Sequence, residues 1–280
     1  MKLANLDGGM SAIVLLTWQG AALAAVVAMV LDVKGQASVT VAGRTSAAQI
    51  ATSLQEDTKV EVAAGGLVSL VHYATREQLT VTGPAVVLVT PKGVEPVSGA
   101  PGQSRKLAES EAKVAANYRG RVVPGALTMR GLKPTIELVY PNNGDTVLDP
   151  ARAITWEADD PKVKVLVKLF AGDKQVGEQS VNGTSLAPAG LATLAPGTGY
   201  RVTISAADEK PVEARFTVAR PEQRDALAAL RPKDRTNVEA WVLYAMALEA
   251  ESAVSEAKSA WGVVAQMRPE AAGLVRRMAR

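Results

Sequence analysis

Two stretches of the chain alternate between apolar and polar residues, the pattern of half-buried β-strands. In the first, from about 32 to 99, Ala37, Val39 and Val41 alternate with polar neighbours. Further short strands are expected at 59–63, 67–73, 78–82 and 85–90, where Gly-Gly and Gly-Pro pairs separate some of them. Short strands at a spacing of roughly ten residues predict a compact antiparallel β-domain.

The second stretch, from about 134 to 219, repeats the alternation in longer segments. Its apolar positions fall every second residue in three runs, 163–169, 200–206 and 214–218, and turn signals such as Asn182-Gly183 separate the expected strands. Trp156 supplies a large apolar side chain near the beginning and is expected to anchor the core. Six or seven short antiparallel strands around a buried tryptophan predict an immunoglobulin-like β-sandwich.

Within this second stretch, Trp156 and the segment Leu-Ala-Pro-Gly-Thr-Gly-Tyr at 194–200 resemble a fibronectin type III domain. In that family a tyrosine opens a late strand after a Leu-x-Pro-Gly turn. The resemblance implies the same sandwich that the alternation predicts.

The first stretch resembles the periplasmic domain of the ferric-citrate regulator (FecR) family. Three segments carry the resemblance: Val-Lys-Gly-Gln-Ala-Ser-Val at 33–39, Ala-Ala-Gly-Gly-Leu-Val-Ser-Leu at 63–70, and Leu-Thr-Val-Thr-Gly-Pro-Ala at 79–85. It implies a periplasmic β-domain at 32–99. The membrane-bound regulators also have a sigma-binding domain before their membrane span and a receptor-contacting domain at their end. Neither has a counterpart in this sequence, so the resemblance does not extend to direct sigma regulation.

An apolar run from Met10 to Leu31 precedes the first β-domain. Its length and the lysine before it predict that residues 1–31 are an export signal or a single membrane anchor. Small residues allow cleavage after Ala24 or after Ala28. A buried core helix or strand is the alternative. The export interpretation predicts a periplasmic protein, held at the inner membrane if the segment stays uncleaved.

The part after each β-domain is expected to be helical. Residues 100–133 form a linker, with a connecting helix over 105–118 or, alternatively, a solvated chain. In the tail, 220–280, Pro221 suits the first position of a helix over 222–230. Thr236 and Glu239 are spaced as a capping box for the next helix.

Residues 238–271 have the spacing of a single tetratricopeptide-like helical hairpin. The positions that carry this pattern are Trp241, Tyr244, Ala245, Leu248, Ala257, Trp261, Val264 and Pro269. Because one hairpin cannot bury its own apolar surface, it must pack on the rest of the chain or on a partner. Trp241, Tyr244, Leu248 and Trp261 are therefore candidate partner-docking residues, expected to serve mostly as structural core.

The composition argues against several kinds of catalytic and metal-binding site. The sequence has no cysteine and a single histidine, His72, which a strand pattern places as a partly buried β-residue. These counts disfavour thiol catalysis and sites for zinc or copper, and no cofactor is predicted. The mild net charge of +3 comes from scattered lysines and arginines, so no nucleic-acid partner is predicted. Two Ser-x-x-Lys pairs lack the other elements of penicillin-recognising enzymes, and no catalytic residue is predicted.

The sequence thus predicts a mainly β protein with an α-helical C-terminal tail and no enzymatic activity. Its expected function is that of an exported interaction or sensory protein of the bacterial cell envelope, which binds protein partners through its β-domains and helical tail. The alternative is a module that binds cell-envelope polysaccharide. Exposed aromatic side chains would favour this alternative, since sugars stack on such rings.

Overall fold

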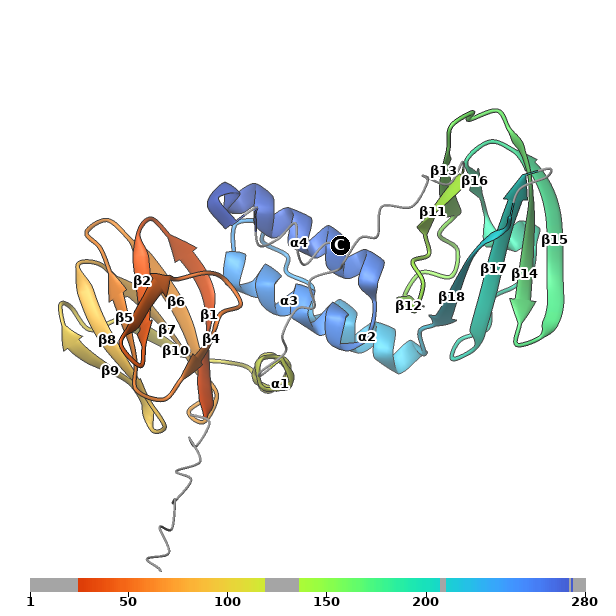
Figure 1. The fold of residues 1–280 in the computed structure, drawn as a ribbon. Helices are drawn as coiled ribbons and strands as arrows, with labels where there is room; N and C mark the ends of the chain where they lie inside the picture. Colours follow the sequence, from red (N-terminus) through yellow and green to blue (C-terminus); the bar gives the residue numbers. More distant parts are fainter. Residues whose placement is uncertain (1–24, 119–135, 207–209, 272, 274–280) are drawn as a thin grey trace, which may run out of the picture.

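The computed structural model describes residues 25–118, 136–206, 210–271 and 273. Two β-domains lie at opposite ends, and a layer of helices from the C-terminal part of the chain lies between them (Figure 1). The protein is mainly β with C-terminal helices, as the sequence predicts.

The first domain consists of two five-stranded sheets, ordered β10-β7-β6-β1-β4 and β3-β2-β5-β8-β9. Its strands are β1 (Val26–Lys34), β2 (Ala37–Val41), β3 (Arg44–Ala47), β4 (Ser53–Gln55), β5 (Thr58–Val62), β6 (Leu67–His72), β7 (Glu77–Thr82), β8 (Ala85–Thr90), β9 (Gly93–Ser98) and β10 (Gln103–Lys106). The five strands expected from the alternation are all present. The other five, β1, β3, β4, β9 and β10, were not among these expected strands. In β3 and β10 every residue is exposed, so no apolar pattern marks them.

Strand β1 is apolar because it is buried on both faces. Ala28 and Val30 belong to the core between the two sheets, whereas Met29 and Leu31 belong to a second core under the helices. A strand covered on both sides reads as a continuous apolar run rather than as an alternation. The expected export segment, Met10–Leu31, therefore reaches too far: residues 26–31 belong to the folded β-domain, and 10–24 lie outside the described residues.

No helix in the described part of the chain is long and apolar enough to span a membrane. The alternative interpretation of a buried core strand is correct for the end of the apolar run.

The second domain is a β-sandwich. Its strands are β11 (Ile136–Tyr140), β12 (Asp145–Val147), β13 (Ile154–Ala158), β14 (Lys164–Ala171), β15 (Lys174–Asn182), β16 (Ser185–Leu186), β17 (Gly199–Ala206) and β18 (Val212–Val218), with a short 3-10 helix at Pro188–Gly190. One sheet has the order β11-β13-β16 and the other β12-β18-β17-β14-β15. All strand pairs in the described part of the sandwich are antiparallel except β12 with β18, which is parallel. This division of mainly antiparallel strands into a small and a large sheet is immunoglobulin-like, as predicted.

Trp156 and Tyr200 occupy the positions in this sandwich that the sequence indicates. Trp156 is 2% exposed and lies in the core between the sheets. Tyr200 is the second residue of β17, shortly after the Pro-Gly turn, and its hydroxyl accepts a hydrogen bond from the backbone N–H of Ala195 at 2.8 Å. A tyrosine at a strand start that binds backbone a few residues upstream is the tyrosine corner of immunoglobulin-like domains.

The helices are α1 (Glu109–Asn117), α2 (Pro221–Leu230), α3 (Val238–Ala250) and α4 (Val254–Met267), followed by a 3-10 turn at Pro269–Ala271. Pro221 begins α2 as expected. The predicted capping box of Thr236 is wrong: the N-cap of α3 is Asn237, whose side chain accepts a hydrogen bond from the N–H of Ala240, while Thr236 binds Asp234 instead. An asparagine one residue later caps a helix at least as well as a threonine.

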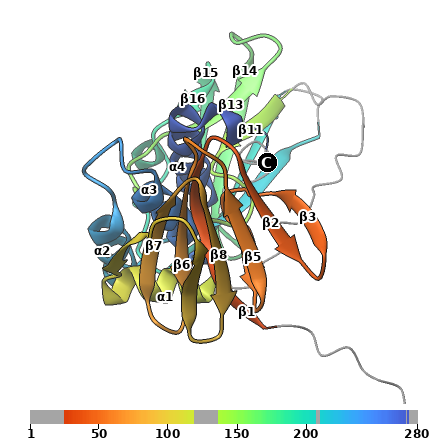
Figure 2. The same cartoon turned by 90° about the vertical axis from the view of Figure 1, so that its left-hand side faces the viewer.

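The helices lie against the β1 side of the first domain (Figure 1), and the view along the molecule from that end shows the first domain in front of the rest (Figure 2). One core contains side chains from α1, α2, α3 and α4 together with Met29, Leu31, Ile50 and Val71 of the first domain. Removing residues 221–280 would therefore expose this apolar face of β1 and β6. In the segment expected as a linker, residues 100–118 contain β10 and the expected connecting helix, α1, whereas 119–133 lie outside the described residues.

Candidate functional site: the helical joint

The four residues predicted for partner docking all lie inside the helical layer. Trp241 is 6% exposed, Tyr244 8%, and both Leu248 and Trp261 0%. Their surroundings are the other helices and the outward face of β1. In the described structure the chain itself covers the hairpin, so these side chains act as structural core.

The polar ends of both tryptophans are also satisfied within the chain. The indole N–H of Trp241 donates to the backbone oxygen of Asp234 at 3.0 Å. That of Trp261 donates to Oε1 of Glu249 at 2.7 Å. A buried indole with its N–H paired is a stable core residue, and no part of it remains to be satisfied by a partner.

An ion pair joins the end of α4 to the first domain. Arg268 binds the carboxylate of Asp32 through Nε and Nη2, and the Asp32 side chain is only 3% exposed. A register shift between Val30 and Asp32 in β1 allows the consecutive residues Leu31 and Asp32 both to face the helices. The hydrogen bonds that Arg268 donates to Asp32 raise the pKa of Arg268 further above its usual high value.

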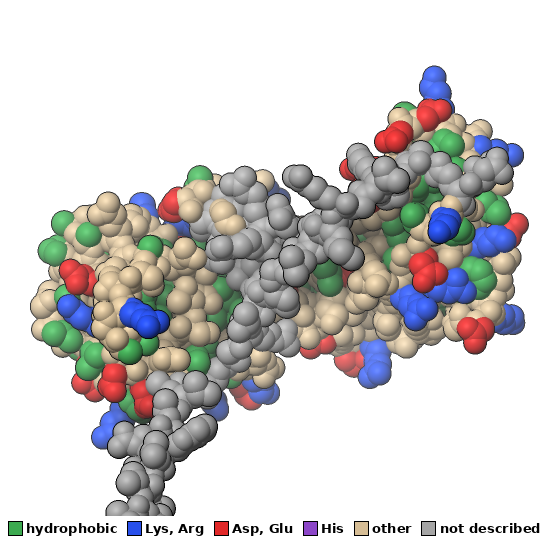
Figure 3. Space-filling view, viewed as in Figure 1, with side chains coloured by type: hydrophobic (Ala, Val, Ile, Leu, Met, Phe, Trp, Pro, Cys, Tyr) green, Lys and Arg blue, Asp and Glu red, His purple; other side chains and the backbone are tan. Residues whose placement is uncertain are grey.

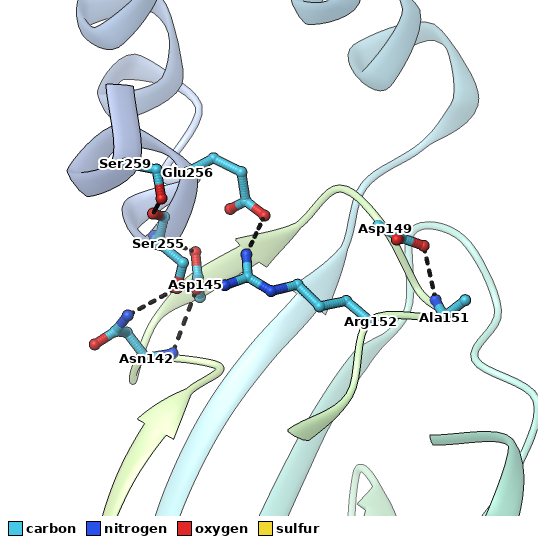
Figure 4. A network of polar contacts seen from close by, with 8 residues as sticks. All are labelled: Asn142, Asp145, Asp149, Ala151, Arg152, Ser255, Glu256 and Ser259. Carbon is cyan, nitrogen blue, oxygen red and sulfur yellow. Dashed lines mark hydrogen bonds and ion pairs between the residues drawn. The ribbon is translucent and has the colours of Figure 1, made fainter. Parts of the chain in front are cut away.

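A polar network joins the start of α4 to the second domain (Figure 4). Ala253, the N-cap of α4, has no side chain that could accept a hydrogen bond from the helix. The carboxylate of Asp145, at the start of β12, takes this role: it accepts from the backbone N–H of Ser255 at 3.4 Å and from the Ser255 hydroxyl. Asn142 donates to the same hydroxyl at 2.7 Å. A side chain from one domain therefore caps a helix of the next.

Beside this network lies an ion pair between an exposed arginine, Arg152, and a partly buried carboxylate, Glu256. Arg152 lies over the ring of Tyr140 at 3.8 Å and donates to Glu256 of α4 at 3.2 Å. Burial raises the pKa of Glu256, and the nearby Asp145 carboxylate adds to this effect. Burial likewise raises the pKa of Tyr140. In both cases the side chain is removed from water where α4 packs on the second domain, which disfavours its charged form.

His72 has a structural role at a distance from the joint. It is 2% exposed, more buried than the sequence predicts. Its Nδ1 accepts from the backbone N–H of Thr75 at 3.3 Å, which leaves Nε2 to donate to the backbone oxygen of Thr90 at 2.9 Å. One ring nitrogen holds the turn after β6 and the other links β6 to β8, so both are engaged in structural hydrogen bonds.

We call the helices with these two attachments, Arg268–Asp32 at one end of α4 and Ser255–Asp145 at the other, the helical joint. The joint can hold the two β-domains in one arrangement, and its polar side chains are hydrogen-bonded to each other in doing so. Among the described residues, no group of three or more His, Asp or Glu side chains could hold a metal ion. Sequence reasoning missed Asp32, Asp145 and Arg268, whose roles depend on contacts between residues far apart in the chain. The one local signal is the poor N-cap at Ala253, which implies that another residue must satisfy the start of α4.

No known family model matches this sequence, and no curated protein does. Among solved structures, one described as fibronectin(III)-like modules of CbhA from Clostridium thermocellum is similar over 30% of this chain and 94% of its own, at 14% identity and a TM-score of 0.20. The immunoglobulin-like fold of the second domain rests on its own strand order and core.

Proposed function

We propose that this protein is a non-catalytic interaction or sensory protein of the bacterial cell envelope, exported and FecR-like in its first domain. Its two β-domains bind protein partners, and its helical hairpin holds them in a fixed relative arrangement. The helical tail thus acts as a spacer, rather than as a docking surface of its own.

The observation that carries this proposal is the double attachment of α4. Its end binds Asp32 of the first domain, and its start binds Asp145 of the second. The apolar layer between these points is continuous with the outer face of β1. A module built in this way presents two β-surfaces with a defined separation, which suits a protein that bridges or positions partners.

The alternative, a polysaccharide-binding module, depends on exposed aromatic rings. Eight of the ten aromatic residues in the described part of the chain are less than 9% exposed, and the other two, Tyr73 and Phe170, are half-buried. The guanidinium of Arg201 also covers the Phe170 ring at 4.0 Å. The described surface therefore gives less support to sugar stacking than to protein contacts.

The test compares the intact chain with one whose joint is loosened. Replacing Asp145 and Ser255 by alanine removes the cap and the hydrogen bonds at the second domain without altering either β-surface. We expect small-angle scattering to show a wider distribution of inter-domain distances. Envelope proteins cross-linked to the wild-type chain should be lost or reduced.

Three outcomes would count against the proposal. If the loosened chain retains every partner, the spacer role is wrong. If neither chain captures a protein, the interaction function is wrong. Retention of the chain by purified envelope polysaccharide, without any protein partner, would favour the alternative.

A further inference from the structure

Two arginines lie directly opposite each other on the outer face of the large sheet of the sandwich. Arg201 of β17 and Arg215 of β18 are a cross-strand pair. Like charges in this position repel each other and destabilise a sheet. The ring of Phe170 under the Arg201 guanidinium, at 4.0 Å, offsets part of this cost for one of the two arginines.

The arginines are only weakly neutralised. Both approach one carboxylate, Glu213, at 3.7 Å and 4.0 Å. Neither guanidinium makes a hydrogen bond anywhere in the described part of the chain, although each carries five N–H donors. These donors are free to form the paired hydrogen bonds with which arginine recognises carboxylates.

A hollow of about 430 Å³ lies beside the two arginines. Gly144, Gly172 and Gly199 line it, and a Cβ built on any of the three would meet no atom within 4 Å. The missing side chains leave open space, with Arg201 and Arg215 on its wall and Asp173 also in its lining. The visible face of this domain carries several basic side chains around acidic ones (Figure 3).

We propose that this hollow binds a carboxylate side chain of an acidic segment in a partner protein, with Arg201 and Arg215 as its forked donors. The proposal rests on the proposed function and adds the chemistry of one partner. A peptide is favoured over an acidic polysaccharide because no aromatic ring in the described lining is open beside the hollow. Tyr200 and Phe216, which also line it, stack on each other in the core and are 7% and 4% exposed.

The test uses the full chain and a fluorescein-labelled hexaglutamate peptide, with binding followed by anisotropy at low salt. Arg215→Gln is the main variant, since the Arg215 side chain is 74% exposed and its loss leaves the fold intact. We expect about tenfold weaker binding, the usual effect of losing hydrogen bonds to a charged group. Arg215→Lys keeps the charge but loses the paired N–H donors of the guanidinium, and we expect it to weaken binding as well.

Lys164→Gln is the matched control. It removes the same charge from the same sheet, six residues along β14 from Phe170, which pairs with Arg201. At the rise of a strand this is a separation of ~20 Å. We expect binding by this variant to be unchanged.

The proposal is overturned if the wild-type chain does not bind hexaglutamate, or if Lys164→Gln weakens binding as much as Arg215→Gln. Full binding by Arg215→Lys would show general charge attraction and would also overturn it. Tighter, Arg215-dependent binding of polygalacturonate would identify an acidic polysaccharide as the occupant instead. Loss of hexaglutamate binding in Arg215→Gln together with retained envelope partners would separate this site from the proposed function, which would stand by itself.

Discussion

Arg268 donates two hydrogen bonds to the carboxylate of Asp32, from Nε at 2.8 Å and from Nη2 at 2.6 Å, although 236 residues separate them. The contact ties the end of the last long helix to the first described strand. The Asp32 side chain is almost fully buried, and Arg268 is its ion-pair partner among the described residues. The helical hairpin and the first β-domain are therefore expected to unfold as one unit.

The first prediction is that Arg268→Met destabilises the protein strongly. It leaves the Asp32 carboxylate buried without its partner, which typically costs ~3–5 kcal/mol. The double variant Asp32→Asn with Arg268→Met should recover much of this loss, because no uncompensated charge remains. Urea unfolding of the full chain measures the free energy of unfolding of the single and the double variant. Arg224→Met is the control, since Arg224 is exposed and pairs only with its neighbour Asp225. A loss in Arg268→Met no larger than that in Arg224→Met would contradict the role of the ion pair.

The second prediction concerns Trp156, the core anchor of the sandwich. Trp156→Ala should cost ~3–5 kcal/mol through lost apolar burial and the cavity that remains. Its indole N–H has no hydrogen-bond partner in the structure, so Trp156→Phe loses no such bond and should cost less. Thermal unfolding of the full chain, followed by near-UV circular dichroism, measures the difference. Equal melting temperatures for Trp156→Ala and the wild type would place the side chain at the surface.

The third prediction separates two buried tyrosine hydroxyls. Tyr200→Phe removes the acceptor of the Ala195 N–H and should cost ~1–3 kcal/mol, because that donor is left without its partner. Tyr140→Phe is the matched control: its hydroxyl is buried without a partner, so its removal should be neutral or stabilising. Chemical denaturation of both variants tests the pair. Similar losses in the two variants would mean that the tyrosine corner contributes no specific stability.

The fourth prediction is a pH dependence at the joint. The pKa of Glu256 is raised above its usual 4.5, chiefly by burial. Below the usual pKa the carboxyl is protonated in both the folded and the unfolded protein. As the pH rises, the unfolded protein loses this proton first, so the contribution of Glu256 to stability falls until its pKa in the folded protein is passed. In Glu256→Gln residue 256 does not titrate, so this decrease in stability with rising pH should be absent.

Melting temperatures of wild type and Glu256→Gln between pH 4 and 8 measure this effect. The two should be similar at the acidic end, and the variant should become relatively more stable toward neutral pH. The introduced glutamine side chain still offers an oxygen to Arg152, so the variant keeps an acceptor for that arginine. A variant that loses stability relative to wild type as the pH rises would mean that the ion pair with Arg152 outweighs the burial of the charge.

The fifth prediction concerns processing of the N-terminal segment. If the chain is exported and cleaved, the cut should follow Ala24 rather than Ala28. Cleavage after Ala28 would remove Val26, Val27 and Ala28 from β1, where Ala28 pairs with both β4 and β6. Mass spectrometry of the protein recovered from the periplasm gives the new N-terminus directly. A stable mature form that begins at Met29 would show that the start of β1 is dispensable.

Much of the fold follows from local pattern. Period-two alternation in β5, β14 and β17 comes from strands with one buried face, so the sequence shows it directly. The Pro-Gly turn before Tyr200 and the proline at the start of α2 are equally local. The spacing of Trp241, Tyr244, Leu248 and Trp261 likewise predicts the hairpin and its apolar face.

Local sequence patterns therefore predict two β-domains, the helical hairpin, and the side chains of the hairpin that must be buried. The surfaces that bury them are known only from the packing of segments far apart in the chain. The alternation of Met29 and Leu31 with Ala28 and Val30 is invisible in sequence because both faces of β1 are apolar. The contacts of Asp32 with Arg268 and of Asp145 with Ser255 join residues more than 100 positions apart, and no local pattern encodes such pairs. Burial of a surface is a property of the two elements that meet, and the sequence of either one alone shows only that it needs a partner.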